Sequence, residues 1–240
     1  TWFVGPIDIF HEGIVLTPSN NFKLTGGLWS TSFLERGLFG NLFPVLLWFF
    51  SDINLTLVPG DILQVEGPNG CGKTTLLRII STALSPTSGQ LLWHGKDISR
   101  HRLDYLSNLL FLGHLPGLKQ SLSPEENLLW WRRINANNSQ LSNRQVLAKM
   151  GLSGYEDVPC YALSAGQQRR AALARLLITE ASLWVLDEPF TAIDKQGVVQ
   201  LEGLLMDHVN KGGVVILSTH QDLRIEGILR LSLPLLAEVA

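Results

Sequence analysis

The chain has 240 residues and a formal net charge of −2 at pH 7. This length suits one good-sized domain, or a domain with an inserted subdomain, and excludes two tandem domains of that size. The charge and the lack of any basic stripe exclude nucleic acid as an expected main partner, and two widely separated cysteines, Cys71 and Cys160, argue against a disulfide framework.

The first part of the chain, residues 1–50, carries few charges and follows neither a strand nor a helix period. We leave it as an unassigned N-terminal segment. No apolar run in the sequence reaches the roughly 18 residues of an ordinary membrane-spanning helix, and Asn41 and Pro44 interrupt the nearest one. No basic segment followed by an apolar core marks a secretory signal.

A pattern of apolar and polar residues that predicts secondary structure begins near residue 51. Residues 53–57 alternate apolar and polar side chains, which predicts a half-buried strand, and Pro59-Gly60 predicts a turn. The apolar run Ile62 to Glu66 predicts a second strand. We expect these two strands to form a pair that leads into the glycine-rich loop that follows.

That loop, Gly67 to Thr75, lies between a strand and a helical run and has the spacing G-x-x-x-x-G-K-[ST]. Its glycines allow successive N–H groups to form a concave anion site at a helix N-terminus. Lys73 would contact the β- and γ-phosphates of ATP, and the Thr74 hydroxyl would be a Mg²⁺ ligand. A chance glycine-rich turn is the alternative, which the strand and helix disfavour. The predicted nucleotide-binding residues are Gly67, Pro68, Asn69, Gly70, Cys71, Gly72, Lys73, Thr74 and Thr75.

The middle of the chain predicts two short strands and then capped helices. The strands are expected at 90–93 and 109–112. A capping box at Ser123 to Glu126 opens a helix to about Arg133, and a second box at Ser142 opens one that ends near Gly151. We expect residues of about 115–165 to form an inserted helical subdomain. Its Trp130-Trp131 pair could dock a partner helix, although core packing is favoured.

A further capping box spans Ser164 to Gln167, and an apolar face follows at Ala172, Leu173, Leu176 and Leu177. A helix that begins beside Gly166 presents free N–H groups, so it is a second candidate anion-binding terminus. Ser164, Gly166 and Gln167 are therefore predicted nucleotide contacts. Considered alone, this stretch is more typical of an ordinary capped helix.

The run Leu183 to Leu186 is typical of a buried strand, and it ends at Asp187-Glu188. In an open parallel sheet, ligands bind beyond the carboxyl ends of the strands. Asp187 is predicted to hold Mg²⁺, and Glu188 to polarise water for attack on the γ-phosphate. An acidic pair in a solvated turn is the alternative.

The last pattern is a helix capped by Asp194 and ended by Gly212-Gly213, followed by a buried strand over residues 214–217. This strand delivers His220 to the same edge of the sheet as the acidic pair. We predict that His220 is catalytic with Glu188, through a hydrogen bond to the γ-phosphate. A purely structural histidine is the alternative.

The ordered motifs at 67–75, 163–168, 183–188, 191–194 and His220 resemble the Walker A, signature, Walker B, D-loop and H-loop of ATP-binding-cassette (ABC) domains. The resemblance implies an α/β P-loop NTPase fold, with a mixed sheet core and an inserted helical subdomain, over residues 51–240. It also implies that the chain pairs head to tail with a second copy of itself. Two ATP molecules with Mg²⁺ would lie between the copies, with Ser164 and Gly166 acting in trans.

Residues 112–119, 163–176, 183–194 and 213–221 are more narrowly similar to the ATP-binding subunits of the haem exporter of cytochrome c maturation. That similarity covers about residues 51–233. It implies an ABC-type ATPase whose hydrolysis is coupled to haem export or handling. The implied partners are membrane permease subunits of a cytochrome c maturation complex, at the cytoplasmic face of a bacterial inner membrane.

Two features depart from the family pattern. His114 stands where most cassettes have the Q-loop glutamine. The first 50 residues also lack the expected opening strand and the aromatic residue that stacks on adenine, for which Phe50 and Trp48 are candidates. No stretch predicts a haem site, and His94, His101 and His114 are expected to be ordinary surface or loop residues.

The sequence is also compatible with two other functions. One is a soluble cassette ATPase that acts on nucleic acid or ribosomes, which the missing basic stripe disfavours. The other is a nucleotide-binding scaffold that hydrolyses little, if the first 50 residues do not complete the adenine site.

Overall fold

The computed structural model describes residues 22–25, 31–32, 47–48, 53–86, 88–135 and 139–234. Its centre is a parallel sheet with the strand order β11-β5-β10-β9-β8. Buried residues fill β9 and β10 from end to end, as expected for strands covered on both faces. The strands are β5 (Ile62–Glu66), β8 (Leu109–Leu112), β9 (Leu183–Asp187), β10 (Val214–Ser218) and β11 (Leu229–Ser232).

The register of the three central strands brings their carboxyl ends level. Ser218 at the end of β10 is paired with Val65 of β5 on one side and with Asp187 of β9 on the other. The segments that follow these strands are the glycine loop, the acidic pair and His220. The prediction that the acidic pair and His220 lie at one edge of the sheet is therefore confirmed, and the glycine loop after β5 lies at this edge too.

A second sheet is antiparallel and has the order β4-β1-β6-β7. Its strands are β1 (Phe22–Thr25), β4 (Leu55–Leu57), β6 (Gln90–Trp93) and β7 (Lys96–Asp97). Apart from this sheet, β2 (Thr31–Ser32) pairs with β3 (Leu47–Trp48). The sequence predicted a core sheet of mixed strand directions. In the structure the parallel and antiparallel pairings lie in separate sheets, and all described strands of the central sheet are parallel.

The predicted pairing of the two strands before the glycine loop is wrong. β4 pairs with β1 of the first 50 residues, whereas β5 pairs with β10 and β11. The reason is burial: β5 is almost entirely buried, which suits the interior of the parallel sheet, while β4 is buried at only one of its three positions. The unassigned first segment therefore supplies a strand of the fold.

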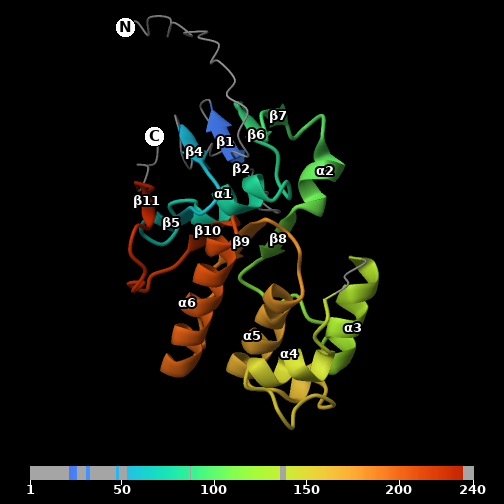
Figure 1. Ribbon diagram of the computed structural model, residues 1–240. Helices are drawn as coiled ribbons and strands as arrows, with labels where there is room; N and C mark the ends of the chain where they lie inside the picture. Colours follow the sequence, from blue (N-terminus) through green and yellow to red (C-terminus); the bar gives the residue numbers. More distant parts are fainter. Residues whose placement is uncertain are drawn as a thin grey trace, which may run out of the picture.

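Helices cover both faces of the parallel sheet (Figure 1). One apolar cluster joins α1 to the sheet face that also meets β4 and β6, and the other lies under α5 and α6. Side chains of β10 alternate between the clusters, with Val214 and Ile216 in one and Val215 and Leu217 in the other. The helices are α1 (Lys73–Ile80), α2 (Arg102–Ser107), α3 (Pro124–Ile134), α4 (Asn143–Lys149), α5 (Ala165–Leu173) and α6 (Lys195–Asn210), with 3₁₀ turns at Cys160–Ala162 and Ala174–Leu177.

The predicted helix caps are confirmed. Ser123, Ser142 and Ser164 each form a complete capping box, and the Asp194 side chain accepts from the Gly197 N–H. Figure 1 shows α3 and α4 at the end of the molecule farthest from the antiparallel sheet. Among the described residues, no helix combines the length and apolar character needed to cross a membrane.

The two tryptophans of α3 differ in their surroundings. Trp131 packs against the main apolar cluster, with the Arg175 guanidinium 4.7 Å from its ring centroid. Trp130 is 39% exposed, and its ring lies 4.1 Å from the Lys119 ammonium. Core packing therefore describes Trp131, while Trp130 is available on the surface.

His208 ties α6 to the strand that carries the acidic pair. Its ring stacks on Trp184 of β9 at a centroid distance of 3.8 Å, and its Nε2 lies 3.1 Å from the Ser182 carbonyl oxygen. Burial lowers the pKa of His208 from 6.5 to about 4. The unfolded chain therefore binds more protons between those values, so the stability that neutral His208 contributes is lost as pH falls through that window.

We expect the free energy of unfolding to drop by about 1 kcal/mol between pH 7 and pH 5 through His208 alone, a value discounted for its partial exposure. Urea unfolding of the unsubstituted chain and of His208→Gln at both pH values measures the contribution of His208 to the free energy of unfolding. The variant should lose less stability on acidification. His101→Gln, which changes an exposed histidine, is the control; an equal loss in all three proteins contradicts the assignment.

Candidate functional site

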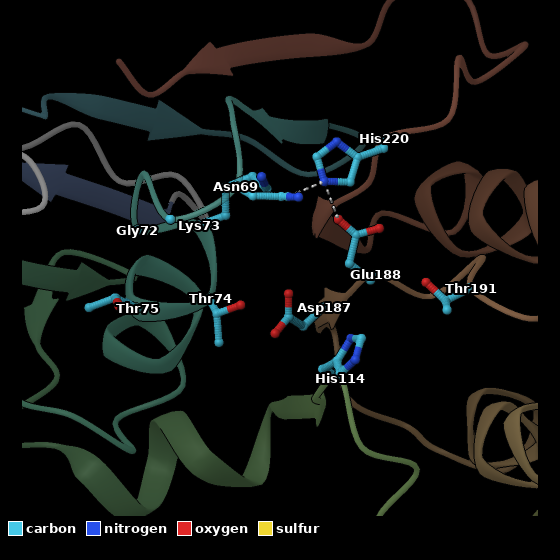
Figure 2. Close-up of a pocket in the computed structure, with 11 residues that line it drawn as sticks. Asn69, Gly72, Lys73, Thr74, Thr75, His114, Asp187, Glu188, Thr191 and His220 are labelled. Carbon is cyan, nitrogen blue, oxygen red and sulfur yellow. Dashed lines mark hydrogen bonds and ion pairs between the residues drawn. The ribbon is translucent and has the colours of Figure 1, made fainter. Parts of the chain in front are cut away.

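A cavity of about 500 Å³ opens where the central strands end. Figure 2 shows its lining, which comes from four separate segments of the chain. The lining residues are 69, 70 and 72–75 around the start of α1, His114 after β8, residues 187, 188 and 191 at and beyond the end of β9, and His220 after β10. The fold thus collects most of the predicted site residues around one space.

The glycine loop wraps the N-terminus of α1. Gly72 is the N-cap residue with φ 101°, and none of the described side chains caps the helix. Gly67 has φ 144°, and a Cβ there would lie 2.5 Å from the Leu233 carbonyl oxygen. Both positions therefore require glycine, and the positive end of the helix faces the cavity without a side-chain acceptor. This is the arrangement that binds phosphate.

Lys73 begins α1 and is largely buried at 8% exposure. Its Nζ donates to the carbonyl oxygens of Gly67 at 2.6 Å and Pro68 at 3.1 Å. An ammonium has three N–H donors, so one remains for an anion in the cavity. The loop itself thus holds the lysine charge beside the helix terminus.

Asp187 is 1% exposed and carries an unsatisfied oxygen. Its Oδ1 accepts from the Ser218 hydroxyl at 2.7 Å, whereas Oδ2 is buried and has no hydrogen-bond partner among the residues that the structure describes. A buried carboxylate oxygen without a partner is costly, which points to a cation or water in the cavity. In Figure 2 the Thr74 hydroxyl faces the same space. Carboxylate and hydroxyl oxygens are ligands that suit Mg²⁺.

Glu188 adopts an unusual backbone conformation, with φ 48°. Such a left-handed conformation is unfavourable for a residue with a Cβ and needs support from its surroundings. Its N–H donates to the Ser218 carbonyl at 3.1 Å and hydroxyl at 3.0 Å, and its carbonyl accepts from Arg169 Nη2 at 2.7 Å. Both sides of the strained residue are therefore fixed by hydrogen bonds.

His220 connects the glycine loop to the acidic pair. Its Nε2 lies 3.1 Å from Asn69 Oδ1 and 3.6 Å from Glu188 Oε1, as the dashed lines in Figure 2 show. His114 lies on the opposite side of the cavity, next to Asp187. Two imidazoles thus flank the carboxylates.

The residues predicted from the second helix terminus lie elsewhere. Ser164, Gly166 and Gln167 do not line this cavity, and the Gln167 side chain is occupied by accepting from the Ser164 N–H at 2.9 Å. A Cβ on Gly166 would lie 2.6 Å from the Ala192 carbonyl oxygen. The N-terminus of α5 therefore packs against the segment after the acidic pair and lies outside this cavity.

Some predicted residues have positions within the loop rather than on the cavity surface. Gly67 and Pro68 supply the carbonyls that bind Lys73, and Cys71 is buried in an apolar cluster, with its N–H donating to the Pro68 carbonyl at 3.3 Å. Of the candidates for stacking on adenine, Phe50 lies outside the described residues, and so does the side chain of Trp48.

Two supporting residues were not predicted, Arg169 and Ser218. Ser218 is the one polar residue of β10 and follows four apolar residues. A polar residue at the carboxyl end of a buried strand indicates a site residue, so Ser218 could have been predicted. Arg169 lies on the buried side of α5, where an arginine is out of place on an apolar face. Both contact the backbone of the acidic pair.

Replacing Gly166 with alanine should destabilise the chain by about 1–3 kcal/mol, because the added Cβ meets a backbone carbonyl that must move. Gly203→Ala is the matched control: it lies in α6 with none of the described atoms within 4 Å of the added Cβ. Removing glycine from a helix interior should raise stability by up to about 1 kcal/mol. Denaturant unfolding of both variants measures the difference, and an unaffected Gly166→Ala would contradict the close approach.

Comparison with protein families matches residues 50–191 to the ABC transporter family. Curated relatives are named cytochrome c biogenesis ATP-binding export protein CcmA. The protein from Pseudomonas fluorescens is 51% identical over 174 residues, which are 72% of this chain and 82% of the relative. The Yersinia pestis protein is 52% identical, over 72% of this chain and 80% of its own. The Hahella chejuensis protein is 50% identical, over 75% and 86%.

Solved structures of low sequence identity share the fold. An ABC transporter ATP-binding protein from Pyrococcus furiosus superposes with a TM-score of 0.68 at 24% identity, covering 89% of this chain and 97% of that one. The dimeric structure of a bacterial ABC transporter cassette gives a TM-score of 0.72 at 20% identity, covering 89% and 94%. These similarities concern the fold of the described chain.

Proposed function

The chain belongs to the ABC transporter family, and from this premise we propose that it is the ATP-hydrolysing subunit of the haem exporter of cytochrome c biogenesis. The observation that carries the proposal is the convergence of Lys73, Asp187 and Glu188 on one cavity beside an uncapped helix terminus. About 50% identity to proteins named as CcmA supports the assignment to cytochrome c biogenesis.

In the proposed mechanism, the triphosphate of ATP lies across the N-terminus of α1. The N–H groups of the loop and the Lys73 ammonium bind its β- and γ-phosphates. Thr74 and Asp187 would hold Mg²⁺, which when bound neutralises charge on those phosphates. The unpartnered Oδ2 of Asp187 supports this role.

Glu188 is proposed as the general base. Its carboxylate would accept a proton from water as the water attacks the γ-phosphorus in line with the departing ADP oxygen. The imidazole of His220 would hydrogen-bond to the γ-phosphate, and its Nε2 lies 3.6 Å from Glu188 Oε1. His114 is proposed to take the place of the usual Q-loop glutamine at the other side of the cavity.

We further propose a head-to-tail dimer of two copies. Each copy would offer the N-terminus of α5, with Ser164, Gly166 and Gln167, to the ATP bound by the other. The absence of these residues from the cavity of their own chain supports an action in trans. The chain is proposed to act at the cytoplasmic face of a bacterial inner membrane, bound to permease subunits.

The domain division remains part of the proposal. The ABC domain would span residues 51–240, with a helical subdomain at about 115–165 that faces the membrane partner. Trp130 on α3, 39% exposed, is a candidate contact there. The strand β1 shows that the unassigned segment 1–50 contributes at least one element to the fold.

Replacing Glu188 with Gln should lower ATP turnover by about 100- to 10,000-fold, because the amide cannot accept the proton from water. ATP affinity should stay within a few-fold, and the dimer should persist with ATP bound. Phosphate release, nucleotide binding and size-exclusion chromatography measure the three effects. Undiminished turnover would remove Glu188 from the role of base, and no turnover in the unsubstituted chain with its membrane subunits would favour a binding scaffold.

Replacing Lys73 with Ala should weaken ATP binding by about 10- to 100-fold, the value of a charge-assisted hydrogen bond to phosphate. In cells that depend on this chain, haem staining of c-type cytochromes should then be lost while the chain still co-purifies with membrane subunits. Normal c-type cytochromes in the Lys73→Ala strain would contradict the cytochrome c role. Co-purification with nucleic acid or ribosomes instead would favour the soluble alternative.

A further inference from the structure

Arg169 of α5 is a buried cation, and each hydrogen bond that it makes to the described part of the chain goes to a backbone carbonyl. It is 4% exposed and forms no ion pair with a carboxylate among the described residues. Its guanidinium donates to carbonyl oxygens at the ends of two neighbouring strands. The acceptors are Asp187 at 2.8 Å, Glu188 at 2.7 Å, Pro189 at 3.3 Å, Gly113 at 3.0 Å and His114 at 3.4 Å.

This arrangement depends on the shape of the arginine side chain. A guanidinium presents five N–H donors in a rigid plane, whereas a lysine ammonium is a single charge with three. Only the planar group can span the loop after β8 and the loop after β9 at once. Burial lowers the pKa of Arg169, and the nearby charges of Asp187 and Glu188 oppose that shift. Arg169 therefore places a positive charge next to the carboxylates of Asp187 and Glu188.

Arg169 supports the strained backbone of Glu188. Its left-handed conformation, with φ 48°, is held by Ser218 at its N–H and by Arg169 at its carbonyl. Arg169 also bonds the carbonyl of His114, whose side chain lines the opposite side of the cavity. The Arg169 side chain thus fixes the backbone of Glu188 on one side of the cavity and the backbone of His114 on the other. The attacking water is proposed to lie between them.

We propose that Arg169 is a positioning residue for ATP hydrolysis, which sets Glu188 and His114 relative to each other through their backbone carbonyls. The inference rests on the proposed function of the cavity. Because Arg169 lies one turn into α5, it also links this geometry to the helix whose N-terminus is proposed to contact the ATP of the other copy.

A general structural role would make any buried arginine of this region equally important, so Arg175 provides a matched control. It is 7% exposed, its pKa is also lowered by burial, and it donates to the Gly117 carbonyl at 2.6 Å. Its guanidinium stacks on Trp131 and contacts neither Glu188 nor His114 among the bonds that the structure describes.

The first test compares Arg169→Lys, Arg169→Met and Arg175→Lys in steady-state hydrolysis by the chain with its membrane subunits. Arg169→Lys should lower kcat by about 10- to 100-fold with KM for ATP within about threefold, since misplacement of a base by about 1 Å has effects of this size. Arg169→Met should be lower still, and Arg175→Lys should keep kcat within about threefold. An unchanged kcat in Arg169→Lys, or an equal loss in Arg175→Lys, overturns the proposal.

The second test does not depend on activity. Hydrogen exchange of the nucleotide-free chain should show faster exchange in Arg169→Lys by about tenfold or more at residues 113–115 and 187–191, two segments far apart in sequence. Arg175→Lys should instead affect residues near Gly117. Unaltered exchange at both segments in Arg169→Lys overturns the positioning role. If the unsubstituted chain fails to hydrolyse ATP while the exchange pattern is as expected, the failure lies in the proposed function and not in the link between the two loops.

Discussion

The candidate site depends on the register that pairs Ser218 with Val65 on one side and with Asp187 on the other. Side chains alternate along a strand, so a shift of one residue in either pairing would turn the strand's apolar set toward the wrong cluster. The alternation of Val214 to Leu217 between two cores opposes any such shift. Hydrophobic packing in the sheet therefore fixes where the polar residues beyond its edge meet.

Positive and negative groups lie on different sides of the cavity at the carboxyl edge of the parallel sheet. The positive end of α1 and the Lys73 ammonium lie on one side of the cavity, and the buried Asp187 carboxylate lies on the other. The described ion pairs do not join Lys73 to Asp187, so neither charge is satisfied by the other. A triphosphate with a divalent cation carries both complementary charges, which is why this geometry suits a nucleotide better than a simple anion.

Local patterns predicted local features well. The capping boxes at Ser123, Ser142 and Ser164 and the buried runs of β9 and β10 were visible because their signals lie within a few residues. The partner of β4 was mispredicted because strand pairing is set by distant sequence, here by β1. Arg169 escaped notice for the same reason, since its five acceptors lie on segments 18 to 56 residues away.

The position of β1 has a practical meaning for any shortened version of this chain. The region shared with the family begins at residue 50, yet β1 spans residues 22–25 and runs between β4 and β6. A protein shortened to begin at residue 50 would lack β1, so β4 and β6 would face each other across a missing neighbour with backbone N–H and C=O groups exposed. Such open edges invite pairing with other chains, so expression of the trimmed form would favour aggregation over a faithful isolated domain.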